Sequence, residues 1–171
     1  MSKHKFYLAI IALFHVSTPA LSQEHNASDS HDMHQTEDIE FGASLGYAYL
    51  KEEQKNGINI HLHAMKRLSD EGLLQHVSVG LGVETILTDE AHYAAMLSVA
   101  VHPWKSLILS VSPGYEWANH DGTWESSYAT HLEATYTFES SNFHYGPVFG
   151  YSKTADTQHY TAGIHFGMHF D

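Results

Sequence analysis

Histidine and glutamate recur at every second position in several stretches of this chain, mostly between apolar neighbours. Three pairs illustrate the spacing: His61 with His63, His131 with Glu133, and His165 with His169. Residues two or four apart on a β-strand point to the same face. Imidazole and carboxylate together suit zinc, copper or nickel, and two or three strands could supply a tetrahedral site. The chemistry indicated is binding of a divalent transition metal.

Eight stretches with period-two alternation position these residues. They lie near 39–51, 57–67, 74–87, 91–103, 106–118, 124–138, 142–152 and 158–170. One register of each stretch is apolar, and the other carries Gly, Ala, Ser, His and Glu. The connections are short and contain turn residues, as at 69–72 and 119–122. The pattern predicts eight antiparallel strands in up-and-down order, with both ends of the sheet on the same side.

Alternation alone does not say whether the apolar register faces lipid or a sealed core, because a secreted lipocalin-like barrel has the same period. Two features favour lipid. The polar register is rich in small residues, as a narrow and filled lumen requires. Aromatic residues also lie toward the strand ends on the apolar register, where two interfacial girdles would place them. We therefore predict an all-β, eight-stranded antiparallel up-and-down transmembrane β-barrel over residues 39–171.

The first 38 residues lie outside this pattern. Residues 1–22 combine a basic start, an apolar run from Phe6 to Val16 and a small-residue site at Ala20-Leu21-Ser22, which predicts a secretory signal peptide. Residues 23–38 are polar and acidic without periodicity, and we expect a disordered periplasmic tail. Its histidines are His25, His31 and His34. Short His/Asp tracts bind divalent metals loosely, although a solvated acidic linker has the same composition.

The charge and the missing cysteines exclude other classes. The formal net charge is −12 with histidine neutral, so binding to nucleic acid is excluded. The chain has no cysteine, which excludes disulfides, thiolate chemistry and a lipoprotein anchor. We expect membrane lipid around a monomeric barrel.

Residues 39–171 resemble, as a pattern, the small eight-stranded outer-membrane proteins of Gram-negative bacteria. The terminal GIHFGMHF is similar to the aromatic-ended last strand that the barrel-assembly machinery recognises in that class. Asp171 departs from the pattern, because most members end on the aromatic residue itself. More narrowly, the chain is similar to small barrels with His-rich N-termini. The resemblance implies a location in the cell outer membrane, with the tail in the periplasm.

With both ends periplasmic, the strand directions assign depths to the inward residues. His63, His76, His144 and His169 fall in the periplasmic half of the lumen together with Glu40, and His61, His131, Glu133 and His165 fall nearer the middle. The candidate metal ligands are His61, His63, His76, His131, Glu133, His144, His165 and His169 in the barrel, with His25, His31 and His34 in the tail.

Two other functions remain open at this point. Inward histidine and glutamate could satisfy one another as an inert polar plug, which would make the barrel purely structural. Alternatively, Glu125, Ser126, Ser127 and His120 near one strand end could modify lipid A, as some small outer-membrane barrels do. No nucleophile motif supports that enzyme, so we predict a non-enzymatic barrel that binds or handles metal.

Overall fold

The computed structural model describes residues 39–120 and 122–170. The predicted signal peptide, the predicted tail with its three histidines, and Asp171 lie outside the described residues. The strands are β1 (Ile39–Leu50), β2 (Lys55–Arg67), β3 (Val77–Leu87), β4 (Ala91–Trp104), β5 (Leu107–His120), β6 (Thr123–Tyr136), β7 (Phe138–Ser140), β8 (Phe143–Lys153) and β9 (Gln158–Phe170). A short 3₁₀-helix, η1 (Gly72–His76), precedes β3.

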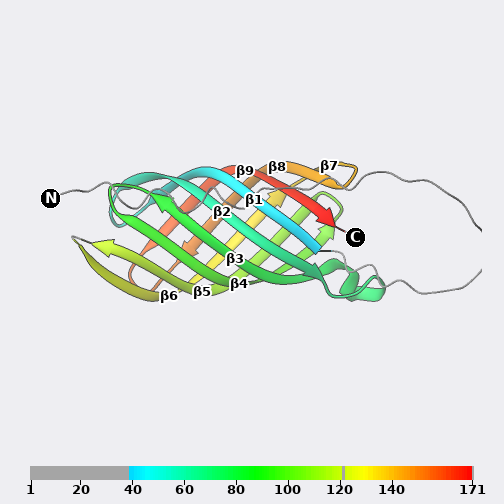
Figure 1. The fold of residues 1–171 in the computed structure, drawn as a ribbon, viewed down its shortest axis with the longest axis horizontal. Coiled ribbons are helices and arrows are strands. Elements are labelled where there is room, and N and C mark those ends of the chain that lie inside the picture. The colour runs from blue at the N-terminus through cyan, green and yellow to red at the C-terminus, as the bar shows by residue number, and fades with distance from the viewer. Residues whose placement is uncertain (1–38, 121, 171) are drawn as a thin grey trace, which may run out of the picture. The chain divides into compact units, whose positions relative to one another are not determined.

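The strands close into one antiparallel barrel (Figure 1). Chain neighbours pair with each other, and β1 closes the ring against β9. The strands β6 and β7 pair with β8 in one continuous register, so together they form a single barrel strand with a break at Thr137. In this register Thr137 lies opposite Gly146, and the neighbouring Pro147, which has no N–H to donate to the ladder, lies opposite Tyr136. The predicted eight-stranded up-and-down barrel is confirmed.

The two ends of the barrel differ in what they carry. The start of β1 and the end of β9 lie together, on the right in Figure 1, with η1 and the turns at 105–106 and 141–142. We call this the terminal end. The turns at 51–54, 88–90 and 154–157 lie at the opposite end with the end of β5 and the start of β6, and we call this the loop end.

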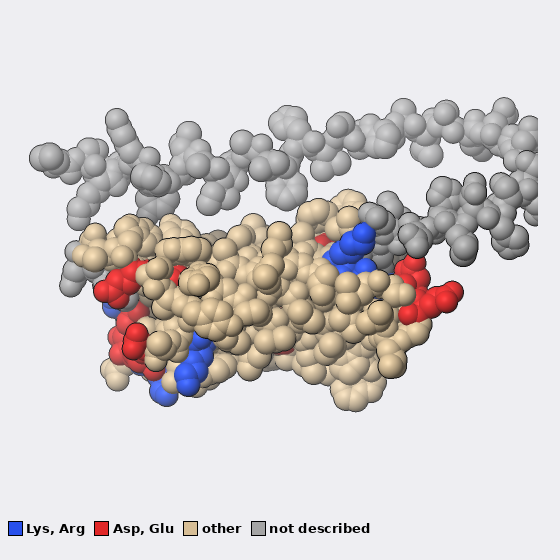
Figure 2. Space-filling view, turned by 90° about the horizontal axis from the view of Figure 1, so that it is seen from below, with Lys and Arg blue, Asp and Glu red and all other residues tan. Residues whose placement is uncertain are grey.

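The described barrel has polar side chains inside and apolar side chains outside. Leu97 and Phe149 are 63% and 62% exposed, whereas His92 and His165 are each 2% exposed. On the face shown in Figure 2, the charged side chains gather near the two ends and leave a largely uncharged belt between them. This distribution is inverted relative to a water-soluble domain and is the one that a lipid environment requires.

Exposed aromatic side chains mark both edges of the belt. Toward the loop end, Tyr93 stacks on Trp124, and Tyr160 contacts the half-buried Tyr151. Toward the terminal end, Phe41 packs edge-on against Phe170 with ring centroids 5.6 Å apart. Two such girdles fit the two interfaces of a bilayer. Within the described ranges, no helix is long and apolar enough to cross a membrane.

Candidate metal centre in the barrel lumen

Four histidines surround one buried glutamate near the terminal end of the lumen. Oε1 of Glu40 lies 3.2 Å from Nε2 of His63, 3.5 Å from Nε2 of His144 and 3.8 Å from Nε2 of His165. Its other oxygen, Oε2, lies 3.9 Å from Nε2 of His169. Glu40 itself is 8% exposed. We call these five residues the Glu40 cluster.

Glycines on the barrel wall make room for the rings of this cluster. Gly42 on β1 pairs directly with Gly167 on β9, with His63 beside Gly42 on β2 and His144 beside Gly167 on β8. A Cβ atom on Gly42 would collide with the His63 ring, and one on Gly167 would collide with the His144 ring. The imidazole rings therefore fill the space that these small inward residues leave open.

A hydrogen bond to the wall orients His165. Its Nδ1 lies 3.1 Å from Oγ of Ser44, which directs Nε2 toward Glu40 and places it 3.1 Å from Nε2 of His144. The His165 ring also stacks between His63 and His144, with centroid distances of 5.2 and 5.1 Å. A fixed outer hydrogen bond of this kind is what holds an imidazole ligand in place at metal sites.

The lumen is filled apart from small cavities. A cavity of about 30 Å³ adjoins the Glu40 cluster and is lined by Glu40, His61, His63, His102, Glu133 and His165 together with Met65, Ile108 and smaller side chains. That volume holds a water molecule or a metal ion, but not an organic ligand.

Further His–Glu contacts cross the lumen nearer its middle. Nδ1 of His61 on β2 lies 3.3 Å from Oε2 of Glu133 on β6. Oε1 of Glu84 on β3 lies 3.2 Å from Nε2 of His159 on β9 and 3.7 Å from Nδ1 of His131 on β6. These strands are not neighbours in the sheet, so the contacts tie opposite walls together.

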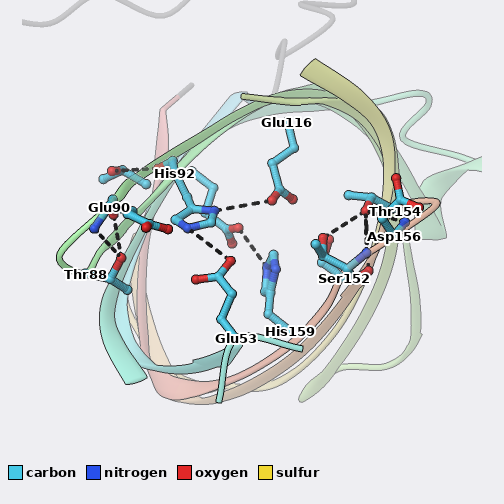
Figure 3. Close-up of polar contacts among 12 residues, drawn as sticks. Glu53, Thr88, Glu90, His92, Glu116, Ser152, Thr154, Asp156 and His159 are labelled. Carbon is cyan, nitrogen blue, oxygen red and sulfur yellow. Dashed lines mark hydrogen bonds and ion pairs between the residues drawn. The ribbon is translucent and has the colours of Figure 1, made fainter. Parts of the chain in front are cut away.

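A last group closes the loop end. His92 on β4 lies between two carboxylates, with Nε2 3.6 Å from Oε1 of Glu53 and Nδ1 3.6 Å from Oε1 of Glu116 (Figure 3). Glu53 reaches this position from the turn between β1 and β2. The barrel thus carries His–Glu groups from one end of the lumen to the other.

The structure brings most of the predicted ligands into the lumen. His63, His144, His165 and His169 meet at Glu40, while His61 contacts Glu133 and His131 lies near Glu84. His76 is different, because it ends η1 as an exposed residue and does not lie on β3. His25, His31 and His34 lie outside the described residues.

Several functional candidates were absent from the predicted ligand set. They are Glu40, Glu53, Glu84, Glu90, His92, Glu116 and His159. The alternation identifies Glu40, Glu84, His92, Glu116 and His159 as inward. It does not show which inward residues meet, because this depends on the stagger between strands. Glu53 and Glu90 lie in or beside turns, where alternation assigns no face.

The residues considered for lipid chemistry do not form a comparable site. Glu125 and Ser126 are exposed near the start of β6, and Ser127 is half-buried. Among the side chains that the structure describes, none donates or accepts a hydrogen bond with Ser126 or Ser127. His120 lies at the end of β5.

The closed barrel, its apolar belt and its polar lumen define the fold of a small transmembrane β-barrel. Solved outer-membrane barrels of low sequence identity share it. Ail, the attachment invasion locus protein of Yersinia pestis, aligns with a TM-score of 0.57 and 14% identity, over 80% of this chain and 100% of the Ail chain. The N-terminal β-barrel domain of Pseudomonas aeruginosa OprF aligns with a TM-score of 0.57 and 15% identity, over 80% and 100% of the two chains.

Neisserial surface protein A aligns similarly, with a TM-score of 0.56 and 12% identity over 78% of this chain and 96% of that protein. No family model matches the sequence, and no curated protein matches it. The likeness to these structures therefore concerns the fold, and the function must be argued from the lumen.

Proposed function

We propose that this chain is an outer-membrane β-barrel that binds a divalent transition metal, most readily zinc, at the Glu40 cluster. The observation that carries the proposal is the approach of four imidazole Nε2 atoms to within 3.9 Å of a single buried carboxylate. Nitrogen and oxygen ligands of this kind suit zinc, copper and nickel.

The spacing of these atoms fits a common metal ion. With metal–nitrogen bonds of about 2.0–2.1 Å, two ligand atoms of a tetrahedral site lie about 3.3–3.4 Å apart. The distances from Nε2 of His144 to Nε2 of His165 and to Oε1 of Glu40 are 3.1 and 3.5 Å, and His63 lies 3.2 Å from the same oxygen. The ligand atoms of Glu40, His63 and His165 all lie within 4.8 Å of one another, as do those of Glu40, His144 and His169, so small side-chain movements would bring either set to bonding distance from one ion.

The same contacts also suit a polar plug in which histidine and glutamate bind each other. The two functions differ at the contact between His144 and His165, whose Nε2 atoms lie 3.1 Å apart. In a plug, one Nε2 carries a proton and donates it to the lone pair of the other. In a metal site, neither Nε2 carries a proton and both lone pairs bind the ion, so a zinc titration distinguishes the two functions.

The membrane position gives this site its context. We propose that the terminal end, which carries the Glu40 cluster, faces the periplasm as the first and last strands of outer-membrane barrels do. The histidines of residues 23–38 would then lie on the same side and could deliver metal to the lumen. Phe170 at the end of β9 would present the signal for the barrel-assembly machinery, and the barrel would act as a monomeric binding protein without catalysis.

Calorimetric titration with Zn²⁺ tests the proposal. The full chain is refolded in detergent with His25, His31 and His34 replaced by asparagine, and we call this variant the tail-substituted chain. We expect a site tighter than about 0.1 mM whose affinity depends on Glu40. Glu40→Gln should weaken it by roughly tenfold or more, whereas Glu125→Gln, which alters an exposed carboxylate at the loop end, should leave it unchanged.

Two results would overturn the metal function. One is the lack of any site tighter than about 0.1 mM in the tail-substituted chain. The other is equal zinc affinity in the Glu40→Gln and Glu125→Gln variants. Either result would leave the polar plug as the role of the lumen.

A further inference from the structure

The loop end contains a second group of metal-ligating side chains that is independent of the Glu40 cluster. One ligand atom each from Glu53, Glu90 and His92 lies within 4.8 Å of the others. His92 belongs to β4, Glu90 directly precedes that strand, and Glu53 comes from the turn between β1 and β2. Figure 3 shows Glu53 pointing into the lumen toward the His92 ring.

From these positions we propose a second divalent-cation site at the loop end, with Glu53, Glu90 and Nε2 of His92 as ligands and Glu116 as a positioning residue. The proposal does not depend on metal binding at the Glu40 cluster, because the two groups share no residue. We call these four residues the loop-end cluster.

Buried carboxylate oxygens without donors point to a cation. Among the described residues, no group donates a hydrogen bond to either carboxylate oxygen of Glu53 or to Oε2 of Glu116. Glu116 is only 6% exposed, and Figure 3 shows its carboxylate directed at His92. A buried carboxylate that lacks donors is costly unless a positive charge compensates it. A divalent cation bound beside His92 would supply that charge.

The two sides of the His92 ring have different roles in this arrangement. Nε2 faces Glu53, and Nδ1 faces Glu116 on the other side, each at 3.6 Å. A carboxylate beside one ring nitrogen favours the tautomer with the proton on that nitrogen and a lone pair on the other, and a lone pair is what a metal ion binds. Glu116 therefore orients and polarises His92, while Glu53 and Glu90 bind the ion directly.

Lys55 is the competing cation at this site. Its Nζ lies 3.3 Å from Oε2 of Glu90 and 3.8 Å from Oε2 of Glu53. Lys55 therefore brings one ammonium to a group that contains the three carboxyl groups of Glu53, Glu90 and Glu116. Since the Lys55 side chain is about one-third exposed, at 34%, it can turn toward solvent when a divalent ion binds.

The ligand set differs from the Glu40 cluster in its preferred metal. Two carboxylates with one imidazole form a harder, oxygen-rich site, which suits Mn²⁺ better than a site dominated by histidine does. Mn²⁺ is also a practical probe, because its electron paramagnetic resonance signal reports both binding and directly bound nitrogen. We infer that the loop end collects divalent cations of this harder class.

The experiment titrates Mn²⁺ into the tail-substituted chain that also carries Glu40→Gln, so that the tail histidines are absent and binding at the Glu40 cluster is weakened. We expect one bound Mn²⁺, with spin-echo modulation from the nitrogen of a single imidazole. Replacing His92 by asparagine should abolish that modulation. Glu53→Gln, a change in a turn that leaves the barrel wall intact, should weaken Mn²⁺ binding by roughly tenfold or more.

Lys55→Met gives the experiment a variant that changes affinity in the opposite direction. Removing the competing ammonium should raise Mn²⁺ affinity if the ion binds between Glu53 and Glu90, and should not change it if the ion binds elsewhere. Far-UV circular dichroism and the heat-dependent gel mobility of folded barrels verify that each variant is folded. Equal Mn²⁺ affinity in the Glu53→Gln, Lys55→Met and parent chains, or bound Mn²⁺ without nitrogen modulation, would overturn the proposal.

Discussion

Glu40 brings side chains from three other parts of the sequence to one point in the lumen. His63 on β2, His144 on β8, and His165 and His169 on β9 all direct Nε2 toward its carboxylate. Each ring alone would be an ordinary inward polar residue. Their convergence on one buried acid is the geometry on which the proposed metal site rests, and the orientation of each ring can be tested by substitution.

Ser44 tests that orientation without touching the metal. Ser44→Ala removes the hydroxyl 3.1 Å from Nδ1 of His165, so the ring loses the contact that directs Nε2 inward. We expect zinc affinity in the tail-substituted chain to fall by about 10–100-fold, as for other outer hydrogen-bond partners of metal ligands. Calorimetry measures the change.

Ser98→Ala is the matched control for this prediction. Ser98 is also a buried lumen serine, but it accepts a hydrogen bond from Ser112, at 2.8 Å. Its removal should leave zinc affinity unchanged. If both serine variants lost the same affinity, the effect would be a general loosening of the lumen, and the positioning role of Ser44 would be wrong.

The strands determine which inward residues become neighbours. His63, Gly42, Gly167 and His144 lie in one row across β2, β1, β9 and β8, with large residues flanking two glycines. Gly82 on β3 continues that row beside His63. Alternation of large and small side chains across facing strands is how a narrow barrel is filled without overlap.

Gly42→Ala tests the row. The new methyl group would collide with the His63 ring and press on His165, so the ring must move away from Glu40. We expect a loss of about 1–3 kcal/mol in stability from overpacking, together with weaker zinc binding. Urea-dependent refolding and calorimetry measure the two effects separately.

Gly57→Ala should lower the stability without weakening zinc binding. A Cβ atom on Gly57 would lie 2.7 Å from the carbonyl oxygen of Leu87 and 2.8 Å from Cγ2 of Ile86, on the barrel wall and away from the Glu40 cluster. Unchanged zinc affinity in Gly42→Ala, despite a stability loss like that of Gly57→Ala, would contradict the role given to the glycine row.

The sequence predicts the strands well because alternation with period two records which face of each strand meets lipid. It assigns His61, His63, His131, Glu133, His144, His165 and His169 to the lumen, and the structure agrees. It fails at His76, since η1 occupies 72–76 and the strand begins one residue later. Periodicity does not detect that short helix before an otherwise regular strand.

The groups that the histidines form were less predictable than their inward direction. The meeting of Glu84 with His159, or of Glu40 with His165, depends on the stagger of the closed sheet, which single strands do not encode. Glu53 is a stronger example, because a turn residue has no alternation to follow and yet its carboxylate enters the lumen.

At the scale of the whole molecule, the described residues form a barrel with an apolar outer surface and a lumen rich in histidine and glutamate. The outward belt of Leu, Val, Ile and aromatic side chains is exposed, and the buried groups include most of the barrel's described histidines. In water this arrangement would be unstable, so the membrane is part of the folded state. The fold likeness to Ail, OprF and the neisserial surface protein agrees with this arrangement.

Leu97→Arg tests the belt. Leu97 lies in the middle of β4 and is 63% exposed, so an arginine there would sit near the centre of the bilayer. We expect a cost of about 2–4 kcal/mol in the free energy of folding into lipid vesicles. Leu73→Arg replaces a leucine that is 89% exposed in η1, outside the belt, and should cost about 0–1 kcal/mol. Equal costs at the two positions would contradict the membrane-spanning assignment.

X-ray absorption at the zinc edge of the tail-substituted chain, loaded with one equivalent of Zn²⁺, tests the central claim most directly. The geometry of the Glu40 cluster predicts a four-coordinate ion with two or more imidazole nitrogens at about 2.0–2.1 Å. The multiple-scattering pattern of histidine should accompany them and be lost in the Glu40→Gln variant. A first coordination sphere of oxygen atoms alone would contradict the claim and leave the lumen as a structural plug.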